Sequence, residues 1–385
     1  MDVNTHVKKI LERAIKNKTF VPFNKIYALH KTKKIKTFVI ISTKGLSGKS
    51  TSGITHIVNN LKNEKYNASW IRNTEVASKN SKLEDSFKVA MIDAGFDMKH
   101  WNVNKQGVYY RKDIEDKLNK GVCRVLFAYL NTYENYCSQN VMKADDIFFD
   151  EFIDAKFIMK DMSVCYYKLI KSLQRTNDSM VVMFANPHTN KNDIIVENGI
   201  VDEIDWESGK TQVKFLESLN TLICYIGDYE NKHFKGDKEL DKFFQHNEKI
   251  SMFNKGILTN PIHNIIPIHK LKYKTLVPIF KYHIREQKED TDFLVSKLDD
   301  TKLLIQQLNV KSHKNLRTYA FRAADLIPNG IFVNEVEYSY LPLLINKYKL
   351  DKVIFNNLYT EDTFKKYVLP KLTVLESIKK KNYVD

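Results

Sequence analysis

Short apolar runs, rich in β-branched and aromatic residues, recur through the first part of the chain and are separated by stretches with apolar residues at helical spacing. The runs predict buried strands at Thr37–Ile41, Ala68–Ile71, Val122–Leu130, Ile147–Phe149, Met180–Ala185 and Thr221–Ile226. The stretches predict helices that include Val3–Ile15, Ile54–Leu61 and Val164–Leu173. Strands that alternate with helices are typical of a largely parallel sheet, so the pattern predicts an α/β fold.

The pattern changes near residue 190. Residues 193–215 contain strand-like stretches around Gly199 and Gly209, and we expect a hairpin-rich insertion there. Residues 227–260 are polar and charged, which favours a linker or lid. Further signals predict a smaller α/β domain: strands at Ile265–Tyr273 and Leu276–Ile284, and a last amphipathic helix near Glu361–Lys381. The expected organisation is a first domain at 1–226, the linker at 227–260 and a second domain at 261–385.

Composition adds information about partners and compartment. The chain has 385 residues, 43% of them hydrophobic, which excludes a disordered chain and fits two domains. Its 61 Lys and Arg against 46 Asp and Glu give a net charge of +15, which favours a polyanionic partner or reflects an AT-rich genome. No apolar run is long enough for a membrane span, and the charged Met1–Lys18 segment is unlike a secretory signal. The 4 scattered cysteines exclude a zinc ribbon and fit a reducing, cytosolic compartment.

One run of residues predicts a phosphate-binding loop. Thr43-Lys44-Gly45-Leu46-Ser47-Gly48-Lys49-Ser50-Thr51 matches the pattern GxxxxGK[ST], except that Thr43 stands where the first glycine is usual. A loop that leaves a strand and enters a helix directs backbone N–H groups at phosphates. Gly48 permits a close approach, Lys49 reaches the terminal phosphates, and the Ser50 hydroxyl is a ligand for Mg²⁺. The alternative, an ordinary turn, is disfavoured by the strand before the run and the helix after it.

A second signal is the acid pair Asp150-Glu151, which directly follows the predicted strand Ile147–Phe149. Asp150 is placed to hold Mg²⁺ through water, and Glu151 to polarise an attacking water. A tandem acid favours a hydrolase over a kinase, because transfer to an acceptor other than water needs no such base. The alternative is a pair of surface acids at the end of a strand.

Two more polar residues fit an ATPase. Asn186 ends the strand Met180–Ala185, the place that senses the γ-phosphate in ATPases with an extra strand between the P-loop and acid-bearing strands. Arg175 ends a helix and could reach a neighbouring subunit's γ-phosphate as an arginine finger, or simply complement the helix dipole. Tyr27, before the first strand, is a candidate for contact with adenine.

These residues together resemble a known family. GLSGKS after FVIIS, the later WIRN and FFDEFID, and MVVMFANP after a helix ending in Arg175 look like the DNA-encapsidation ATPases of small protein-primed podophages, which are terminase-like. The match is dense over residues 37–190 and thinner beyond. The resemblance implies an ASCE-type P-loop ATPase domain followed by an RNase-H-like domain. It also implies an ATP hydrolase that uses ATP and Mg²⁺ to translocate double-stranded viral DNA into a preformed prohead.

The resemblance further implies partners and residue roles. The motor would act as a homo-oligomeric ring, commonly a pentamer, on the portal of the prohead, with a structural packaging RNA in some members and no membrane. It would work in the host cytoplasm, transiently on the prohead, and be absent from the mature virion. Lys49 and Ser50 would form the P-loop, Asp150 and Glu151 the acid pair, and Arg175 the trans-acting finger. Arg72, in WIRN, would contact nucleotide or DNA.

The second domain departs from a working nuclease. A two-metal nuclease needs several carboxylates, the first usually on the leading strand. The predicted leading strands, within Ile265–Ile284, contain none, and Asp325, Glu335 and Glu337 are expected to be surface charges. We therefore interpret this domain as a nuclease relic that binds DNA, portal or RNA.

Two alternatives for the whole chain stay open. One is another nucleic-acid-dependent ATPase, such as a helicase-like motor, which would share the P-loop and the acid pair. The other is a non-enzymatic nucleic-acid-binding protein with a degenerate nucleotide site, for which Thr43 is the main support.

Overall fold

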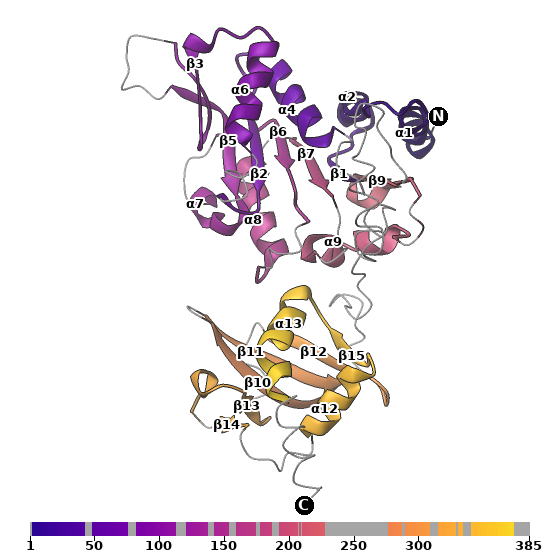
Figure 1. Cartoon of the computed structure of the whole chain (residues 1–385), viewed down its shortest axis with the longest axis vertical. Helices are drawn as coiled ribbons and strands as arrows, with labels where there is room; N and C mark the ends of the chain where they lie inside the picture. The colour runs from indigo at the N-terminus through magenta and orange to yellow at the C-terminus, as the bar shows by residue number, and fades with distance from the viewer. Residues whose placement is uncertain are drawn as a thin grey trace, which may run out of the picture. The chain divides into compact units, whose positions relative to one another are not determined.

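The structure is a computed structural model. It describes residues 2–42, 48–75, 82–112, 121–137, 142–153, 159–174, 178–186, 192–206, 208, 210–227, 276–286, 289–308, 315–328, 330–333 and 340–372. They form two compact units, one built mainly from residues before 262 and the other mainly from residues 262–385 (Figure 1). Residues 228–260 of the linker predicted at 227–260, and the predicted strand Ile265–Tyr273, lie outside the described residues.

The first unit is built on a nine-stranded sheet in the order β3-β4-β5-β2-β6-β7-β1-β9-β8. Its strands are β1 (Thr37–Ser42), β2 (Ala68–Arg72), β3 (Trp101–Asn104), β4 (Gly107–Tyr110), β5 (Val122–Tyr129), β6 (Asp146–Phe149), β7 (Met180–Ala185), β8 (Gln212–Leu216) and β9 (Thr221–Ile226). The six central strands, from β5 to β9 in this order, run parallel, while β3, β4 and β8 pair antiparallel at the edges. All six strands predicted from the apolar runs are confirmed.

The helices of the first part of the chain connect or flank these strands (Figure 1). They are α1 (Val3–Asn17), α2 (Phe23–Tyr27), α3 (Leu29–Lys33), α4 (Lys49–Asn60), α6 (Leu83–Asp93), α7 (Glu134–Cys137), α8 (Met162–Gln174) and α9 (Asp193–Glu197). Short 3₁₀ turns occur at Met98–His100, Leu130–Thr132, Ile200–Glu203 and Glu217–Leu219. The predicted first helix is confirmed as α1, which Asp2 caps by accepting a hydrogen bond from the Thr5 N–H (3.2 Å).

Helix α4 packs closely on the sheet because it carries a glycine at the point of contact. A Cβ atom on Gly53 would lie 2.9 Å from Phe184 and 3.0 Å from both Phe148 and Trp70. These three aromatic residues come from β7, β6 and β2 and are fully buried. The close approach brings the start of α4 next to the ends of the strands that carry the acid pair and Asn186.

The prediction for residues 193–215 is partly wrong. The stretch before Gly199 is the short helix α9, and a 3₁₀ turn follows it, so no strand forms there. A hairpin does form, but later in the chain: β8 pairs with β9, from Gln212↔Tyr225 to Leu216↔Thr221. The apolar residues Ile194, Ile195 and Val196 are buried from helical positions, which explains why their run looked like a strand.

The second unit contains a six-stranded sheet in the order β14-β13-β10-β11-β12-β15. Its strands are β10 (Val277–Glu286), β11 (Glu289–Lys297), β12 (Leu303–Leu308), β13 (Thr318–Ala320), β14 (Ile331–Phe332) and β15 (Val353–Phe355). Its helical segments are α12 (Tyr340–Lys349), α13 (Leu358–Thr363), the 3₁₀ turn Ala323–Asp325 and the π-helical turn Phe364–Val368. An antiparallel meander, β10-β11-β12, is extended beside β10 by two parallel strands, which is an RNase-H-like arrangement.

Helices α12 and α13 lie over one face of this second sheet (Figure 1). The core between them includes Tyr282, Phe293 and Phe364, all with no exposed surface. The predicted strand Leu276–Ile284 is confirmed as β10, and the predicted last helix is described only as far as Leu372. Within the described ranges, no helix combines the length and the apolar character that a membrane crossing requires.

Candidate active site

The strand order brings the predicted site residues to one edge of the first sheet. Strand β7 lies between β6 and β1, and all three are parallel, so their carboxyl ends meet. Asp150 and Glu151 follow β6, Asn186 follows β7, and Lys49 begins the helix after β1. This is the arrangement with an extra strand between the P-loop and acid-bearing strands that the sequence analysis expected for Asn186.

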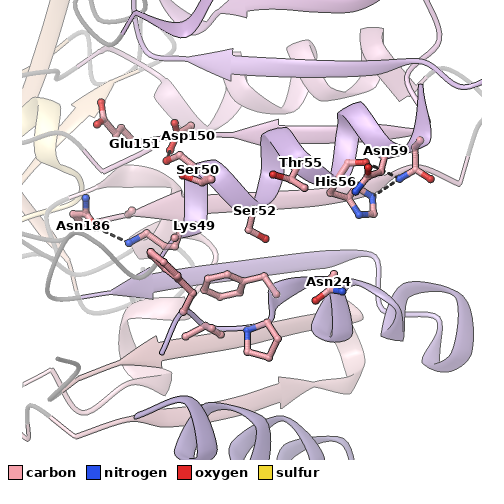
Figure 2. Close-up of a pocket in the computed structure, with 18 residues that line it drawn as sticks. Asn24, Lys49, Ser50, Ser52, Thr55, His56, Asn59, Asp150, Glu151 and Asn186 are labelled. Carbon is pink, nitrogen blue, oxygen red and sulfur yellow. Dashed lines mark hydrogen bonds between the residues drawn. The ribbon is translucent and has the colours of Figure 1, made fainter. Parts of the chain in front are cut away.

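The first turn of α4 carries those predicted phosphate-binding residues that the structure describes. Gly48 precedes the helix with a φ of 82°, a left-handed conformation that glycine adopts without strain. Lys49 is 6% exposed and its Nζ donates a hydrogen bond to Asn186 Oδ1 at 2.5 Å (Figure 2). Ser50 Oγ donates to Asp150 Oδ1 at 2.9 Å. Thr51 lines the same cavity, whereas Thr43 to Ser47 lie outside the described residues.

Burial affects the protonation of Lys49, the lysine of the predicted phosphate-binding loop. It lowers the pKa of Lys49 to about 7, because a buried ammonium loses its hydration, while the nearby charges of Asp150 and Glu151 act in the opposite direction. A triphosphate would add further negative charge beside the Nζ atom. The ammonium form is therefore the one that nucleotide binding would favour.

The two acids occupy different environments. Asp150 is 1% exposed, whereas the side chain of Glu151 is 55% exposed. Glu151 also has a φ of 54°, which is unusual for a residue with a Cβ atom. In Figure 2 both side chains lie at the end of the cavity that also holds Ser50. A buried acid beside a serine hydroxyl suits metal binding, and a partly exposed acid suits contact with water.

Arg72 connects the two acids. It is the last residue of β2, which lies beside β6, and it is 5% exposed. Its Nη2 donates to Asp150 Oδ2 at 2.6 Å and its Nη1 donates to Glu151 Oε2 at 2.5 Å. The sequence analysis placed Arg72 against nucleotide or DNA and did not foresee this pairing. The available signal was an arginine at the end of a buried strand, but nothing in the sequence showed that this strand neighbours β6.

A cavity of about 570 Å³ extends from the acid pair along α4 (Figure 2). One wall is apolar and comes from the segment that leads into α2 and from the first residue of that helix: Phe20, Val21, Pro22 and Phe23. Phe20 is 49% exposed, and its ring would lie 3.0 Å from a Cβ atom placed on Gly48. The opposite wall is polar and comes from α4, with Ser52, Thr55 and His56 among its residues, whereas Asn24 of α2 lies on the same side as the apolar wall (Figure 2).

The candidate for adenine contact, Tyr27, is not placed for that role. It is 2% exposed and packs edge-on against Phe38, His56 and Phe148 within the core. The apolar wall that begins at Phe20 offers the flat, partly exposed surface that Tyr27 was expected to supply. Sequence reasoning missed this wall because it lies well before the predicted phosphate-binding run and belongs to no recognisable motif.

The donor set at the acid pair fits Mg²⁺ bound together with nucleotide. Magnesium prefers oxygen ligands and is usually held by one or two carboxylates plus substrate phosphates. Ser50 and Asp150 supply a hydroxyl and a carboxylate 2.9 Å apart. Over the described ranges, no group of three or more His, Cys, Asp or Glu side chains could hold a metal by itself. A magnesium ion here would therefore depend on phosphate oxygens for the rest of its ligands.

Two further predictions concern residues outside this site. Arg175 lies just beyond α8 and outside the described residues, so its position as a finger stays a prediction. The expectation that Asp325 is a surface charge is wrong: Asp325 is fully buried. Its carboxylate accepts hydrogen bonds from the Arg322 Nε (2.8 Å) and Nη2 (2.5 Å), and from the Arg285 backbone N–H (2.9 Å). Glu335 and Glu337 lie outside the described residues.

Comparison with known proteins finds structures but no sequence relatives. No protein-family model and no curated protein matches the chain. The Phi-28 gp11 DNA packaging motor is similar at 14% identity over 90% of this chain and 95% of its own, with a TM-score of 0.48. The bacteriophage Phi-29 viral genome packaging motor assembly is similar at 15% identity over 92% and 99%, with a TM-score of 0.49. The N-terminal domain of the DNA packaging ATPase from bacteriophage phi29 is similar at 15% identity over 55% and 97%, with a TM-score of 0.42.

Proposed function

We propose that this protein is an ATP-driven motor that translocates double-stranded viral DNA into a preformed prohead, hydrolysing ATP to ADP and phosphate. The observation that carries the hydrolase is the convergence of Lys49, Ser50 and the acid pair at one edge of a parallel sheet, beside a cavity of about 570 Å³. That volume lies in the range of small-molecule sites, about 300–1,000 Å³. The motor itself rests on the resemblance of the motifs and on the basic character of the chain.

The residues of α4 would bind the phosphates. The N-terminus of the helix presents backbone N–H groups, and Lys49 would leave Asn186 to contact the terminal phosphates. Asn186 would then face the γ-phosphate as a sensor. Ser50 and Asp150 would hold Mg²⁺, which supplies positive charge for the developing phosphate oxygens. The apolar wall at Phe20 would cover the adenine ring.

Glu151 would orient and deprotonate the attacking water. In this structure Arg72 donates to one oxygen of this carboxylate, Oε2, at 2.5 Å, so the guanidinium competes with water for that oxygen while the pair is intact. The exposed fraction of the Glu151 side chain, 55%, leaves room for it to turn toward the cavity. Glu151 would therefore act as the base after its carboxylate leaves Arg72, whereas Arg72 can keep its bond to Asp150.

Translocation would use an assembly of subunits. Arg175 would act in trans on the γ-phosphate of a neighbouring subunit, and the ring, a pentamer, would dock on the portal with or without a structural RNA. The net charge of +15 would favour contact with the phosphate backbone of DNA. The motor would work in the host cytoplasm, transiently on the prohead.

The second unit would bind DNA, portal or RNA and would not cleave DNA. Asp325 is occupied by Arg322 and the Arg285 backbone, so its oxygens are committed to protein donors rather than to a metal. The central strand β10 carries Lys281 and His283 on one face, both at least nine-tenths buried, and a lysine cannot serve as a metal ligand while charged. We expect the full-length chain to show no Mg²⁺- or Mn²⁺-dependent cleavage of DNA, and cleavage lost in Asp325→Ala would refute this.

The test of the proposed function is ATP hydrolysis by the full-length chain, measured alone, with duplex DNA, and with DNA and purified proheads. Lys49→Ala should abolish hydrolysis, and Glu151→Gln should bind ATP but not hydrolyse it. Lys36→Ala is the matched control, because Lys36 is an exposed lysine just before β1 that pairs with Asp178. Wild-type turnover in Glu151→Gln would refute the role of the base.

The same measurements separate the alternatives. Stimulation by proheads beyond that by DNA supports a packaging motor, whereas stimulation by DNA alone supports a helicase-like ATPase. No hydrolysis under any condition would support a non-enzymatic nucleic-acid-binding protein.

A further inference from the structure

The turn that carries the acid pair holds Glu151 in a costly backbone conformation. Its φ of 54° is left-handed, which costs a residue with a Cβ atom roughly 1–2 kcal/mol. Such a conformation persists only where the surrounding structure imposes it. The backbone conformation also decides where the Cβ atom points, and so where the carboxylate can reach.

Backbone hydrogen bonds fix the residues on both sides of Glu151. The Asp150 N–H donates to the Ile71 carbonyl at 3.0 Å, which ties the start of the turn to the end of β2. The Phe152 N–H donates to the Phe184 carbonyl at 3.1 Å, which ties the end of the turn to β7. Glu151 therefore sits between two anchored neighbours.

Two buried amide side chains fix the carbonyl groups of the same turn. Asn73 Nδ2 donates to the Glu151 carbonyl at 2.9 Å, and Asn192 Nδ2 donates to the Phe152 carbonyl at 2.8 Å. The two asparagines are 2% and 3% exposed. Asn73 is itself held, because its backbone carbonyl accepts a hydrogen bond from the Asn131 N–H at 3.0 Å. Of these anchors, the Asn73 amide is the one that acts on Glu151 itself.

We propose that Asn73 is a positioning residue for ATP hydrolysis: its amide keeps Glu151 in the left-handed conformation and so aims the carboxylate at the attacking water. This inference rests on the proposed ATPase function. Asn73 and Arg72 are adjacent at the end of β2 and hold different parts of Glu151, one its carbonyl and the other its carboxylate. The hydrogen bond from Asn73 to the Glu151 carbonyl persists when the carboxylate leaves Arg72, so the Glu151 side chain changes its orientation while its backbone stays in place.

Loss of the Asn73 amide should have a specific kinetic signature. Without the Asn73 amide, Glu151 can relax toward an ordinary backbone conformation, and its carboxylate moves relative to the phosphate site. A displacement of about 1 Å in a catalytic group can cost about 100-fold in rate. Asn73 does not itself line the cavity, so nucleotide affinity should not follow the rate.

The test compares Asn73→Asp and Asn73→Ala with wild type in the full-length chain, with Asn198→Asp as the control. Asparagine to aspartate keeps the shape but replaces the donor with an oxygen that faces the Glu151 carbonyl. Asn198 also donates from Nδ2 to a backbone carbonyl, that of Ile194 at 2.7 Å, but does so at the end of α9. We expect kcat, measured well below the melting temperature of each variant, to fall by about 10- to 100-fold in both Asn73 variants, with the Kd for Mg·ATP close to wild type. The control should keep wild-type kcat.

A second measurement distinguishes positioning from general damage. Single-turnover assays measure the slow residual hydrolysis that the Glu151→Gln variant retains, and adding Asn73→Ala should cause no further loss of that residual rate, because the group that Asn73 positions is already gone. Wild-type kcat in both Asn73 variants, a loss of Mg·ATP affinity in proportion to the rate, or an additive loss in the double variant would overturn the inference. If the wild-type chain itself failed to hydrolyse ATP under these conditions, the proposed function would fail instead.

Discussion

Replacing Arg72 by methionine tests how much the charge between the two acids matters for stability. Methionine keeps much of the apolar stem of arginine but removes the guanidinium, which donates to Asp150 at 2.6 Å and to Glu151 at 2.5 Å. The side chain of Asp150 is 2% exposed, so its carboxylate would stay buried beside Glu151 without a cation. We expect Arg72→Met to destabilise the first unit markedly.

The magnitude follows from burial. Removing one partner of a buried ion pair costs about 3–5 kcal/mol. Coulomb attraction gives a similar figure, about 4 kcal/mol for two charges about 4 Å apart at an effective dielectric constant of about 20. The pair with Glu151 adds only about 0–1 kcal/mol, because that side chain is 55% exposed. At roughly 2–4 °C per kcal/mol, the melting temperature should fall by about 10 °C.

Scanning calorimetry of the full-length variants measures this shift. The matched control is Lys36→Met, which breaks the exposed pair with Asp178 (2.9 Å, side chains 56% and 71% exposed) and should cost about 1 kcal/mol or less. Mg·ADP should narrow the gap between Arg72→Met and wild type, because the metal brings a positive charge to Asp150. Equal shifts in the two variants would refute the reasoning.

Three further outcomes can be measured. Gly53→Ala should lower the free energy of unfolding, measured in urea, by about 1–3 kcal/mol, because the added Cβ would lie 2.9 Å from Phe184. This loss should outweigh the helix-favouring effect of alanine, and a stabilised variant would contradict the packing argument. Burial lowers the pKa of Lys49 to about 7, so Lys49 should be mostly neutral above that pH and should take up a proton when ATP binds. The affinity for ATP should therefore weaken as the pH rises. Calorimetry of ATP binding near pH 8.5, in buffers of different ionisation enthalpy and with Lys49→Met as control, detects the proton uptake. Arg175→Ala should bind ATP but hydrolyse it with a rate lower by a factor of about 10³–10⁵. If Arg175 acts in trans, mixing this variant with Glu151→Gln should restore part of the ATPase activity. No recovery of activity in rings that exchange subunits would refute the trans role.

Local sequence determines the elements and the chemical types at the site. The β1 run is rich in β-branched residues and the β7 run is apolar throughout, so both favour buried strands. Lys49-Ser50 follows one strand and Asp150-Glu151 another, and those positions depend only on the neighbouring residues. The α/β class and the residues suited to phosphate, magnesium and water were therefore predictable.

The tertiary structure decides which of these residues meet. The order of strands brings Asn186 to Lys49 and lets Arg72 reach Asp150 and Glu151, because strand pairing joins segments that are far apart in the chain. The left-handed conformation of Glu151 depends on bonds from two other strands, so no local propensity predicts it. Burial also depends on tertiary structure. From its sequence context Asp325 was expected to be a surface charge, but it lies inside the second unit, because hydrogen bonds from Arg322 and the Arg285 backbone stabilise its buried carboxylate. Residue type and local pattern determine what each segment can do, and the pairing of distant segments decides which of those possibilities the folded chain uses.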